Sequence, residues 1–327
     1  MDAFCVPWAD FPLPVLGFGT RALGGSSEWS GPTGEEARRL LQRAYEGGIR
    51  FFDTAPSYGE GRAESLLGEW AHEVGRENLL IGTKVGLRRT SEGHYFSDLR
   101  PDSIYREVER SLRRLNVEAV DLVQIHWPDP RTPLAESLAA LQTLKDDGKT
   151  KAIGLGNFHG KRLREALASS AVMDSLQVPF HPLDRRIEGG DLPLCRERNL
   201  PVITYSPLAM GLFSETEPEE LCQSPGHARH HLRWFGEAVR PAVQNLRSRW
   251  RSYAEDLGLT LSQLTIAWVR QHPGISMVLL GASRESQLRE NLGGGLPIPK
   301  PVWRVLRKDL NQWQQETKQE NRAKRGI

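Results

Sequence analysis

The chain has 327 residues, of which 39% are hydrophobic and 26% are charged, and its net charge at pH 7 is +2. This length and composition are typical of a globular protein that forms two domains or one large α/β barrel. The nearly balanced charge excludes the basic surface that binding to nucleic acid or to an anionic membrane requires, so neither partner is expected.

The cysteines and the first residues bear on where the protein works. Cys5, Cys195 and Cys222 are too few and too far apart for a disulfide framework, which favours the reducing cytoplasm. The opening residues lack a basic stretch followed by an apolar one, and no run of about 18 apolar residues occurs. We therefore expect a cytoplasmic protein that is neither exported nor membrane-spanning.

The N-terminal part predicts a short hairpin at residues 11–14 and then a buried strand over 15–20. Residues 17–22 fit the glycine pattern of dinucleotide-binding domains, but that pattern requires a helix to begin at once. Gly24, Gly25 and Pro32 intervene, so this reading is not favoured. The first helix is expected to begin near Thr33 and to end at Gly47.

From residue 49 onward, short apolar segments alternate with segments of helical periodicity. Further strands are expected at 49–52, 79–83, 120–125, 152–155, 175–178, 201–204 and 276–280. Helices are expected between them, as in residues 134–147, where leucines recur at helical spacing. Together with the strand over residues 15–20, these segments give eight strands. None of them has an alternating polar face, which predicts the α/β class and a closed parallel (β/α)₈ TIM barrel.

The whole of residues 1–318 is expected to form this one barrel, with the hairpin as an N-terminal cap and a disordered tail at 319–327. The connection before the last strand is far longer than usual, so an insertion of loop and helix is expected at about 209–258. The insertion contains four candidate metal ligands, which are Cys222, His227, His230 and His231. Their spacing fits no standard zinc site, and we expect no metal and a solvated loop.

Polar or aromatic residues close most of the expected strands. They are Asp53, Lys84, His126, Asn157, Gln177 and Tyr205. Each alone has an ordinary explanation, as a solvated strand end, a core histidine or a packing aromatic. Because the carboxyl ends of barrel strands meet at one rim, where active sites of this fold lie, all six together indicate a site.

The first strand-end residues have the chemistry for carbonyl reduction. A tyrosine has a reference pKa of about 10 and is a poor acid near neutrality unless a nearby positive charge favours its phenolate. Lys84 is expected to supply that charge and Asp53 to pair with Lys84. His126 is then expected to hydrogen-bond the carbonyl oxygen that Tyr58 protonates. None of these groups is a hydride source, so a nicotinamide cofactor is required.

Several segments resemble the aldo-keto reductase superfamily. They are residues 52–59, 83–84, 121–129, 148–149 with 152–158, and 205–208. The resemblance covers nearly the whole chain and implies an NADPH-dependent barrel enzyme with the catalytic tetrad Asp53, Tyr58, Lys84 and His126. It further implies nicotinamide contacts for Asn157, Gln177 and Tyr205, pyrophosphate contacts for Ser206 and Leu208, and backbone contacts for Gly19 and Thr20.

Residues 281–291 resemble the adenosine-binding segment of bacterial aldo-keto reductases and of potassium-channel β-subunits. The resemblance implies adenosine contacts for Gly281, Ser283, Arg284, Gln287, Glu290 and Asn291. Many relatives carry Pro-Lys-Ser here, and their lysine is the usual partner of the 2′-phosphate of NADPH. That lysine is absent from this chain, so the candidate partners of the 2′-phosphate are Ser283, Arg284 and Gln287. NADH is the less favoured cofactor. Gly156 stands where the family usually has Ser, and His181 stands where Asn is common. The change at Gly156 is expected to affect the affinity for the cofactor.

The function expected is reduction of an aldehyde or ketone to an alcohol. The alternative is a nucleotide-binding sensor or partner subunit with little turnover, but channel β-subunits have Asn at the position of His126. A third reading uses Lys84 as a Schiff-base nucleophile. The mouth of the substrate site is expected to be apolar and to be lined by Trp29, Phe96 and Trp127, and Arg131 is expected close enough to contact an anion of the substrate. The sequence does not distinguish between sugars, aromatic aldehydes and small ketones as substrates, and it does not predict the oligomeric state.

Overall fold

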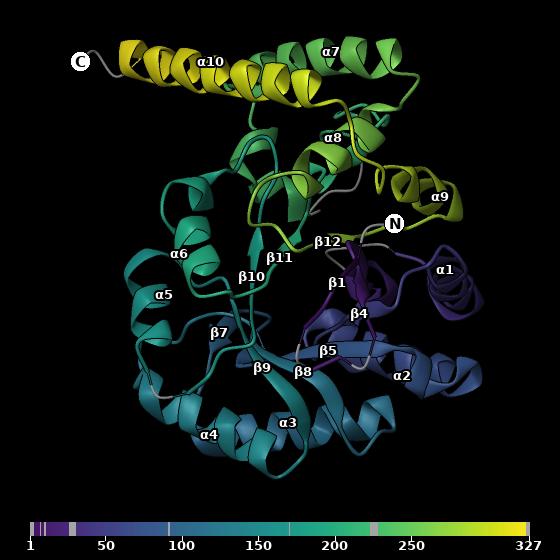
Figure 1. Cartoon of the computed structure of the whole chain (residues 1–327), viewed down its shortest axis with the longest axis vertical. Helices are drawn as coiled ribbons and strands as arrows, with labels where there is room; N and C mark the ends of the chain where they lie inside the picture. Colours follow the sequence, from purple (N-terminus) through teal and green to yellow (C-terminus); the bar gives the residue numbers. More distant parts are fainter. Residues whose placement is uncertain are drawn as a thin grey trace.

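The computed structural model of the chain describes residues 3–6, 8–9, 11–25, 31–90, 92–169, 171–222 and 228–324. Eight strands form a closed parallel barrel in the order β10-β11-β12-β3-β4-β5-β8-β9, which confirms the predicted TIM barrel (Figure 1). The strands are β3 (Leu16–Gly19), β4 (Phe51–Asp53), β5 (Leu80–Val85), β8 (Val120–Ile125), β9 (Thr150–Gly156), β10 (Ser175–Pro179), β11 (Val202–Tyr205) and β12 (Met277–Leu280).

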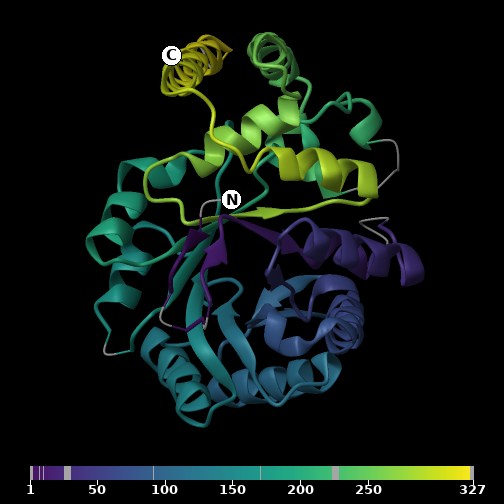
Figure 2. The same ribbon diagram turned by 45° about the vertical axis from the view of Figure 1, so that its right-hand side comes forward.

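Helices surround the barrel on its outside (Figures 1 and 2). They are α1 (Gly34–Glu46), α2 (Arg62–Val74), α3 (Pro101–Leu115), α4 (Leu134–Asp146), α5 (Gly160–Leu167), α6 (Asp191–Glu197), α7 (Arg240–Asp256), α8 (Leu261–Arg270) and α9 (Glu285–Gly293). Short 3₁₀ turns follow the ends of several strands: η1 (Thr20–Gly24), η2 (Tyr58–Gly61), η4 (Arg186–Gly189) and η5 (Ala209–Gly211), whereas η3 (Arg76–Asn78) lies between α2 and β5. Among the described helices, none is long and apolar enough to cross a membrane.

The side chains of β4 show how each strand divides its residues between two apolar cores. Phe51 points into the barrel and meets Trp8 at a ring-centroid distance of 6.4 Å. Phe52 points outward and packs against Trp70 of α2 at 5.0 Å. Asp53, the next residue, is again on the inner face and is 3% exposed. Because successive strand residues alternate between faces, one short segment supplies both cores and the site.

The N-terminal hairpin closes one end of the barrel. Strand β1 (Ala3–Phe4) pairs antiparallel with β2 (Leu13–Pro14), so the expected hairpin exists, with its first strand earlier than predicted. Val6, Trp8 and Leu13 join the apolar cluster inside the barrel. The polar side chains lie at the opposite end of the barrel, where the strands have their carboxyl ends.

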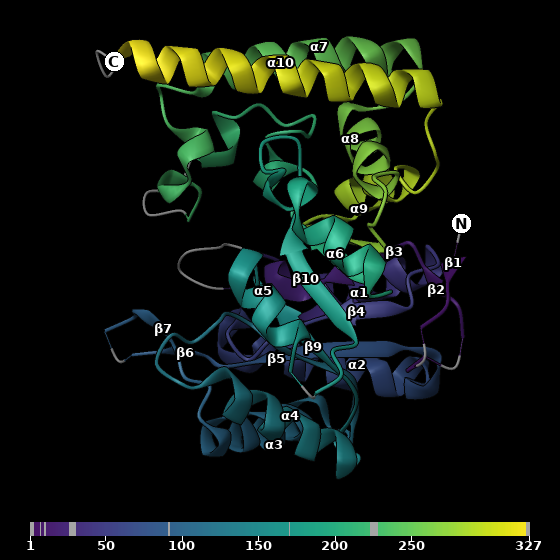
Figure 3. The same ribbon diagram turned by 60° about the vertical axis from the view of Figure 1, so that its left-hand side comes forward.

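The long connection between β11 and β12 contains more regular structure than the sequence predicts. After η6 (Glu220–Cys222), η7 (Ala228–His231) and η8 (Arg233–Phe235), helix α7 begins at Arg240. Helix α10 (Lys300–Lys324) lies alongside α7 at one end of the molecule (Figures 1 and 3). The tail expected to be disordered from residue 319 is therefore helical as far as Lys324, and residues 325–327 lie outside the described part.

A second hairpin, which the sequence analysis did not predict, follows β5. Its strands are β6 (Leu87–Arg89) and β7 (Tyr95–Ser97), which pair antiparallel and stand apart from the barrel (Figure 3). Phe96 lies on this hairpin.

Strand β5 itself continues two residues beyond its predicted end, so Lys84 lies within the strand and not after it.

Candidate active site

A cavity of about 570 Å³ lies at the carboxyl ends of the barrel strands. One part of it is lined by Asp53 from β4, Tyr58 from η2 and His126 after β8, and another by Arg284 and Asn291 at α9. Its volume falls in the range of small-molecule and cofactor sites. The cavity is therefore the candidate active site, and it joins the strand-end residues to the segment 281–291.

Three of the predicted catalytic residues are in direct contact. The Lys84 ammonium, 2% exposed, donates hydrogen bonds to Asp53 Oδ2 at 2.5 Å, to the Thr54 carbonyl at 3.0 Å and to the Tyr58 hydroxyl oxygen at 3.3 Å. Burial alone would lower the pKa of Lys84, but the negative charge of Asp53 and the contact with Tyr58 outweigh it and raise that pKa. Lys84 is thus held as a cation directly behind the Tyr58 hydroxyl.

Asp53 is fixed by more donors than the sequence analysis foresaw. Its Oδ1 accepts a hydrogen bond from Gln177 Nε2 at 2.8 Å and a longer one from Gln124 Nε2 at 3.4 Å. Gln124 is fully buried on the inner face of β8 and was not predicted as part of the site. Thr20, whose backbone was expected at the cofactor, does not line the cavity; its buried hydroxyl donates a hydrogen bond to the Asp53 carbonyl at 3.1 Å.

The His126 imidazole stands edge-on to the Tyr58 ring, with centroids 5.9 Å apart. Burial, and then the positive charges of Lys84 and Arg21, hold the pKa of His126 well below its ordinary value. The ring is therefore neutral at neutral pH, and a neutral imidazole can donate one N–H to an oxygen in the cavity. Tyr58 and His126 thus present two donors to the same space.

Asn157 connects β9 to its neighbours on the rim. Its Nδ2 donates to the His126 carbonyl at 2.8 Å, and its Oδ1 accepts from the Tyr205 hydroxyl at 2.7 Å. A Cβ at Gly156 would lie 2.4 Å from the Ile125 carbonyl oxygen. In this structure the absence of a side chain at Gly156 therefore lets β8 and β9 approach closely.

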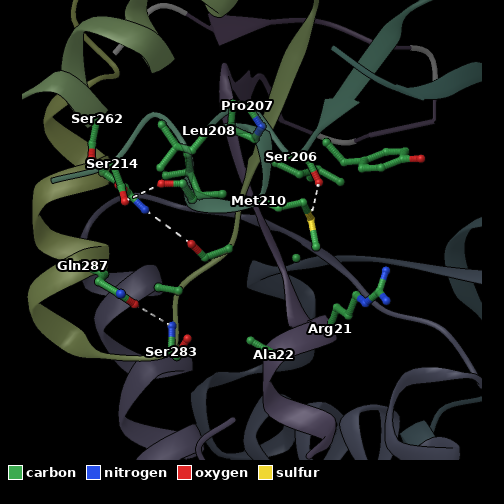
Figure 4. Close-up of a pocket in the computed structure, with 18 of the residues that line it drawn as sticks. Arg21, Ala22, Ser206, Pro207, Leu208, Met210, Ser214, Ser262, Ser283 and Gln287 are labelled. Carbon is green, nitrogen blue, oxygen red and sulfur yellow. Dashed lines mark hydrogen bonds between the residues drawn. The ribbon is translucent and has the colours of Figure 1, made fainter. Parts of the chain in front are cut away.

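At the other end of the cavity, α9 presents the remaining predicted residues. Gln287 Oε1 accepts the Ser283 backbone N–H at 3.0 Å (Figure 4). Asn291 Nδ2 donates to the Gly281 carbonyl at 3.3 Å. Glu290 also lines the cavity and accepts from the Thr260 hydroxyl at 2.9 Å. Gly19, Ser206 and Leu208 line it as well, so every predicted cofactor residue except Thr20 faces this space.

Of the predicted substrate residues that the structure describes, one lines the cavity and two do not. Trp127 lines the cavity and is 44% exposed. Phe96 and Arg131 do not line it; the Arg131 guanidinium lies 5.9 Å from the centre of the Phe96 ring on the β6–β7 hairpin. Trp29 lies outside the described residues. The structure instead brings Arg21 to the cavity, although sequence reasoning had noted only its neighbour Thr20.

The segment with the predicted solvated loop also lines the cavity, with residues that include Glu215, Glu220 and Arg229. Arg229 is held by two backbone carbonyls. Its guanidinium donates to the carbonyls of Met210 at 2.7 Å and Leu221 at 2.8 Å. Within the described residues, no group of three or more His, Cys, Asp and Glu side chains could hold a metal ion. His181 does not line the cavity and accepts the Asp184 N–H at 3.1 Å, in a turn where burial lowers its pKa to about 4.

Comparison with known proteins gives a consistent result. Residues 15–307 match the aldo/keto reductase family. A protein of Escherichia coli (strain K12) named NADH-specific methylglyoxal reductase is 33% identical over 296 residues, which cover 86% of this chain and 90% of that protein. A protein of Arabidopsis thaliana named probable voltage-gated potassium channel subunit beta is 31% identical, covering 81% of this chain and 83% of that protein.

Among solved structures, the glycerol dehydrogenase of Gluconobacter oxydans superimposes on this chain with a TM-score of 0.86. The two sequences are 30% identical, and the match covers 95% of each chain. The likeness therefore extends over the barrel, the long connection and the added helices together.

Proposed function

This chain belongs to the aldo/keto reductase family, and we propose that it reduces an aldehyde or ketone to an alcohol with NADPH as hydride donor and Tyr58 as proton donor. The family makes it an NAD(P)H-dependent oxidoreductase that acts on small carbonyl compounds. The observation that carries the proposed mechanism is the contact of the buried Lys84 ammonium with the Tyr58 hydroxyl.

The residues of the cavity suit a nicotinamide dinucleotide. Tyr205 offers a ring face at the end of β11, with Asn157 and Gln177 beside it as carboxamide partners. Ser206 and Leu208 would hold the pyrophosphate, and the N-terminal end of α9 with Arg284 would hold the adenosine phosphate. When bound, the reduced nicotinamide supplies the hydride.

The protein side of the reaction is a proton transfer. Hydride delivery to the carbonyl carbon leaves negative charge on the oxygen, and Tyr58 donates its hydroxyl proton there. The charge then left on the phenol oxygen is stabilised by the Lys84 N–H that already points to it. A neutral His126 donates a second hydrogen bond to the carbonyl oxygen and orients it.

The same contacts argue against Lys84 as a Schiff-base nucleophile. An amine must lose its proton before it can attack a carbonyl, and Asp53 holds this one protonated. The sensor alternative has some support from the Arabidopsis relative named as a channel subunit. A protein that binds NADPH but reduces no compound in a broad carbonyl screen would favour that alternative.

The test of the mechanism is Tyr58→Phe, with Tyr95→Phe as a matched control on the exposed β7 strand. A positioned general acid typically contributes about 10²- to 10⁴-fold, so Tyr58→Phe should lower the rate of carbonyl reduction by that factor. NADPH binding, followed by cofactor fluorescence, should be unchanged in both variants. A Tyr58→Phe protein that reduces carbonyls at the wild-type rate would remove this mechanism.

We propose NADPH over NADH because Arg284 lines the cavity and can donate two hydrogen bonds to a 2′-phosphate. The neighbouring Glu285 is held by Arg39 and Arg43 on α1, at 3.5 and 3.3 Å. That carboxylate does not line the cavity, so it offers no acceptor for a ribose hydroxyl. The Escherichia coli relative is named as NADH-specific, so the preference needs its own measurement.

Titration of both cofactors against Arg284→Ala provides that measurement. Charge-assisted hydrogen bonds contribute about 1.5–3 kcal/mol, so the preference for NADPH should fall roughly 10- to 100-fold. Arg289→Ala, an exposed arginine of the same helix outside the cavity, should leave the preference intact. An unchanged ratio of dissociation constants in Arg284→Ala would refute the role of this residue.

We further propose that the enzyme works in the cytoplasm. Cys5 and Cys195 are free thiols, as expected in a reducing compartment.

A further inference from the structure

We propose that Gln124 is a positioning residue that keeps a hydrogen-bond donor on Asp53 when a bound nicotinamide takes the amide of Gln177. The inference rests on the proposed function, in which Gln177 contacts the carboxamide of the cofactor. Its starting point is that Oδ1 of Asp53 accepts from two amides, Gln177 Nε2 at 2.8 Å and Gln124 Nε2 at 3.4 Å.

The two glutamines differ in their access to the cavity. Gln177 lines the cavity, together with Asn157 and Tyr205, so its amide can turn toward a bound nicotinamide. Gln124 does not line the cavity and is fully buried inside the barrel. Its amide can therefore serve only groups of the barrel interior, where the structure shows it bonded to Asp53.

The barrel provides a fitted space for the Gln124 side chain. In the sheet register, Gln124 of β8 lies opposite Lys84 of β5 on one side and Gly154 of β9 on the other. A Cβ at Gly154 would lie 3.0 Å from Gln124 Cγ and 2.4 Å from the Ser175 hydroxyl oxygen. Because a side chain at this position would crowd the glutamine, Gly154 leaves room for Gln124 beside the ion pair of Asp53 and Lys84.

An apolar side chain would fill this space at a lower cost than Gln124. The Oε1 atom of Gln124 is buried and has no hydrogen-bond partner among the residues that the structure describes. A buried polar atom without a partner destabilises the folded state. The contact of 3.4 Å with Asp53 offsets little of that cost, because an ordinary N–H···O bond is about 2.9 Å long. Packing therefore does not explain Gln124, whereas a second donor for Asp53 does.

The movement required of Gln124 is small. When the Gln177 amide turns to the nicotinamide, Oδ1 of Asp53 loses its shorter bond, and a buried carboxylate oxygen without a donor is costly. An approach of Gln124 Nε2 by about 0.5 Å would give a bond of ordinary length. Oδ2 of Asp53 would then stay on the Lys84 ammonium, which contacts the Tyr58 hydroxyl. Cofactor binding would thus leave the surroundings of the proton donor unchanged.

The test is a double-mutant cycle on cofactor affinity. The dissociation constant of NADPH is measured by cofactor fluorescence for the wild type, Gln124→Met, Gln177→Met and the double variant, with Gln271→Met as the control. Methionine keeps the length of glutamine and removes its amide. Gln271 is half-buried outside the cavity and bonds the Ile298 backbone, so its replacement should leave the affinity for NADPH unchanged.

We expect Gln124→Met to weaken NADPH binding about 10- to 100-fold, because no donor then replaces Gln177 on Asp53 when the cofactor takes its amide. In the Gln177→Met background the same change should have almost no effect, since cofactor binding then takes no donor from Asp53. Equal losses in the two backgrounds would mean that Gln124 acts through the packing of the barrel. No loss in either would mean that it has no part in cofactor binding, and each of these results would overturn the inference.

A second variant and the choice of readout keep the test decisive. Gln124→Leu removes the same amide and repeats the cycle if Gln124→Met does not fold. The measurement needs no turnover, so a wild type that binds NADPH but reduces no carbonyl compound would refute the proposed reaction while the cycle still decides the role of Gln124. If the wild type binds NADH in its place, the cycle is measured with NADH. A wild type that binds neither cofactor would refute both the proposed function and this inference.

Discussion

Replacing Lys84 with Met tests how strongly the buried ion pair depends on its partner. The side chain keeps most of its length but loses the ammonium that lies 2.5 Å from Asp53 Oδ2. At that separation and an effective dielectric constant of about 20, the Coulomb attraction is about 7 kcal/mol, and desolvation of the two charges offsets much of it. Loss of one partner of a buried pair costs about 3–5 kcal/mol, because the other charge stays buried without compensation. Gln177 still donates to Asp53, so we expect Lys84→Met to lower the free energy of unfolding by about 3 kcal/mol.

Urea unfolding followed by tryptophan fluorescence would measure this loss, since the chain has nine tryptophans. The double variant Asp53→Asn with Lys84→Met should be more stable than Lys84→Met alone, because no uncompensated charge remains. The control is Lys161→Met, whose ammonium lies 3.5 Å from Glu165 in an exposed pair, and it should change the stability by less than about 0.5 kcal/mol. Equal losses in Lys84→Met and Lys161→Met, or a double variant with the summed losses of its parents, would refute the reasoning.

Two further predictions concern Glu107 and Gly156. Burial raises the pKa of Glu107 to about 7 although its Oε2 accepts the Gly86 N–H at 2.6 Å, so the folded state holds this proton more tightly than the unfolded state. Its contribution to stability therefore falls as pH rises from about 4.5 to above 7, by on the order of 3 kcal/mol. Glu107→Gln should accordingly raise the urea midpoint more at pH 8 than at pH 5, and an equal effect at both would contradict this. Gly156→Ala should cost about 1–3 kcal/mol in thermal unfolding, because the added methyl meets the Ile125 carbonyl, whereas Gly189→Ala adds a methyl to open space and should be nearly neutral.

The barrel and most of the rim were predictable because strand periodicity is a local signal. Phe52 and Asp53 fall on opposite faces of any strand that contains both, whatever surrounds it. Helix α10 also carried a signal that the sequence analysis did not use. Trp303, Leu306, Leu310 and Trp313 recur at spacings of three and four, and the last three are buried.

The parts that were missed depend on contacts between segments far apart in the chain. Gln124 reaches Asp53 across 71 positions, and Gln177 does so across 124, so no local pattern marks either as a partner of this carboxylate. Phe96 was predicted at the apolar substrate mouth and Arg131 near an anion of the substrate. They lie instead against each other at the β6–β7 hairpin, which forms a sheet of its own outside the barrel.

The alternation of side chains in β4 also constrains how the length of the chain can change in evolution. Deletion of one residue within that strand would exchange the faces of Phe52 and Asp53. The carboxylate would enter the apolar layer against Trp70, and an aromatic ring would take its place beside Lys84. In the connection between β11 and β12, by contrast, doubling the length of a loop costs only about 0.6 kcal/mol in closure entropy. Insertions and deletions can therefore reshape the rim of the cavity while the chemistry beneath it stays the same.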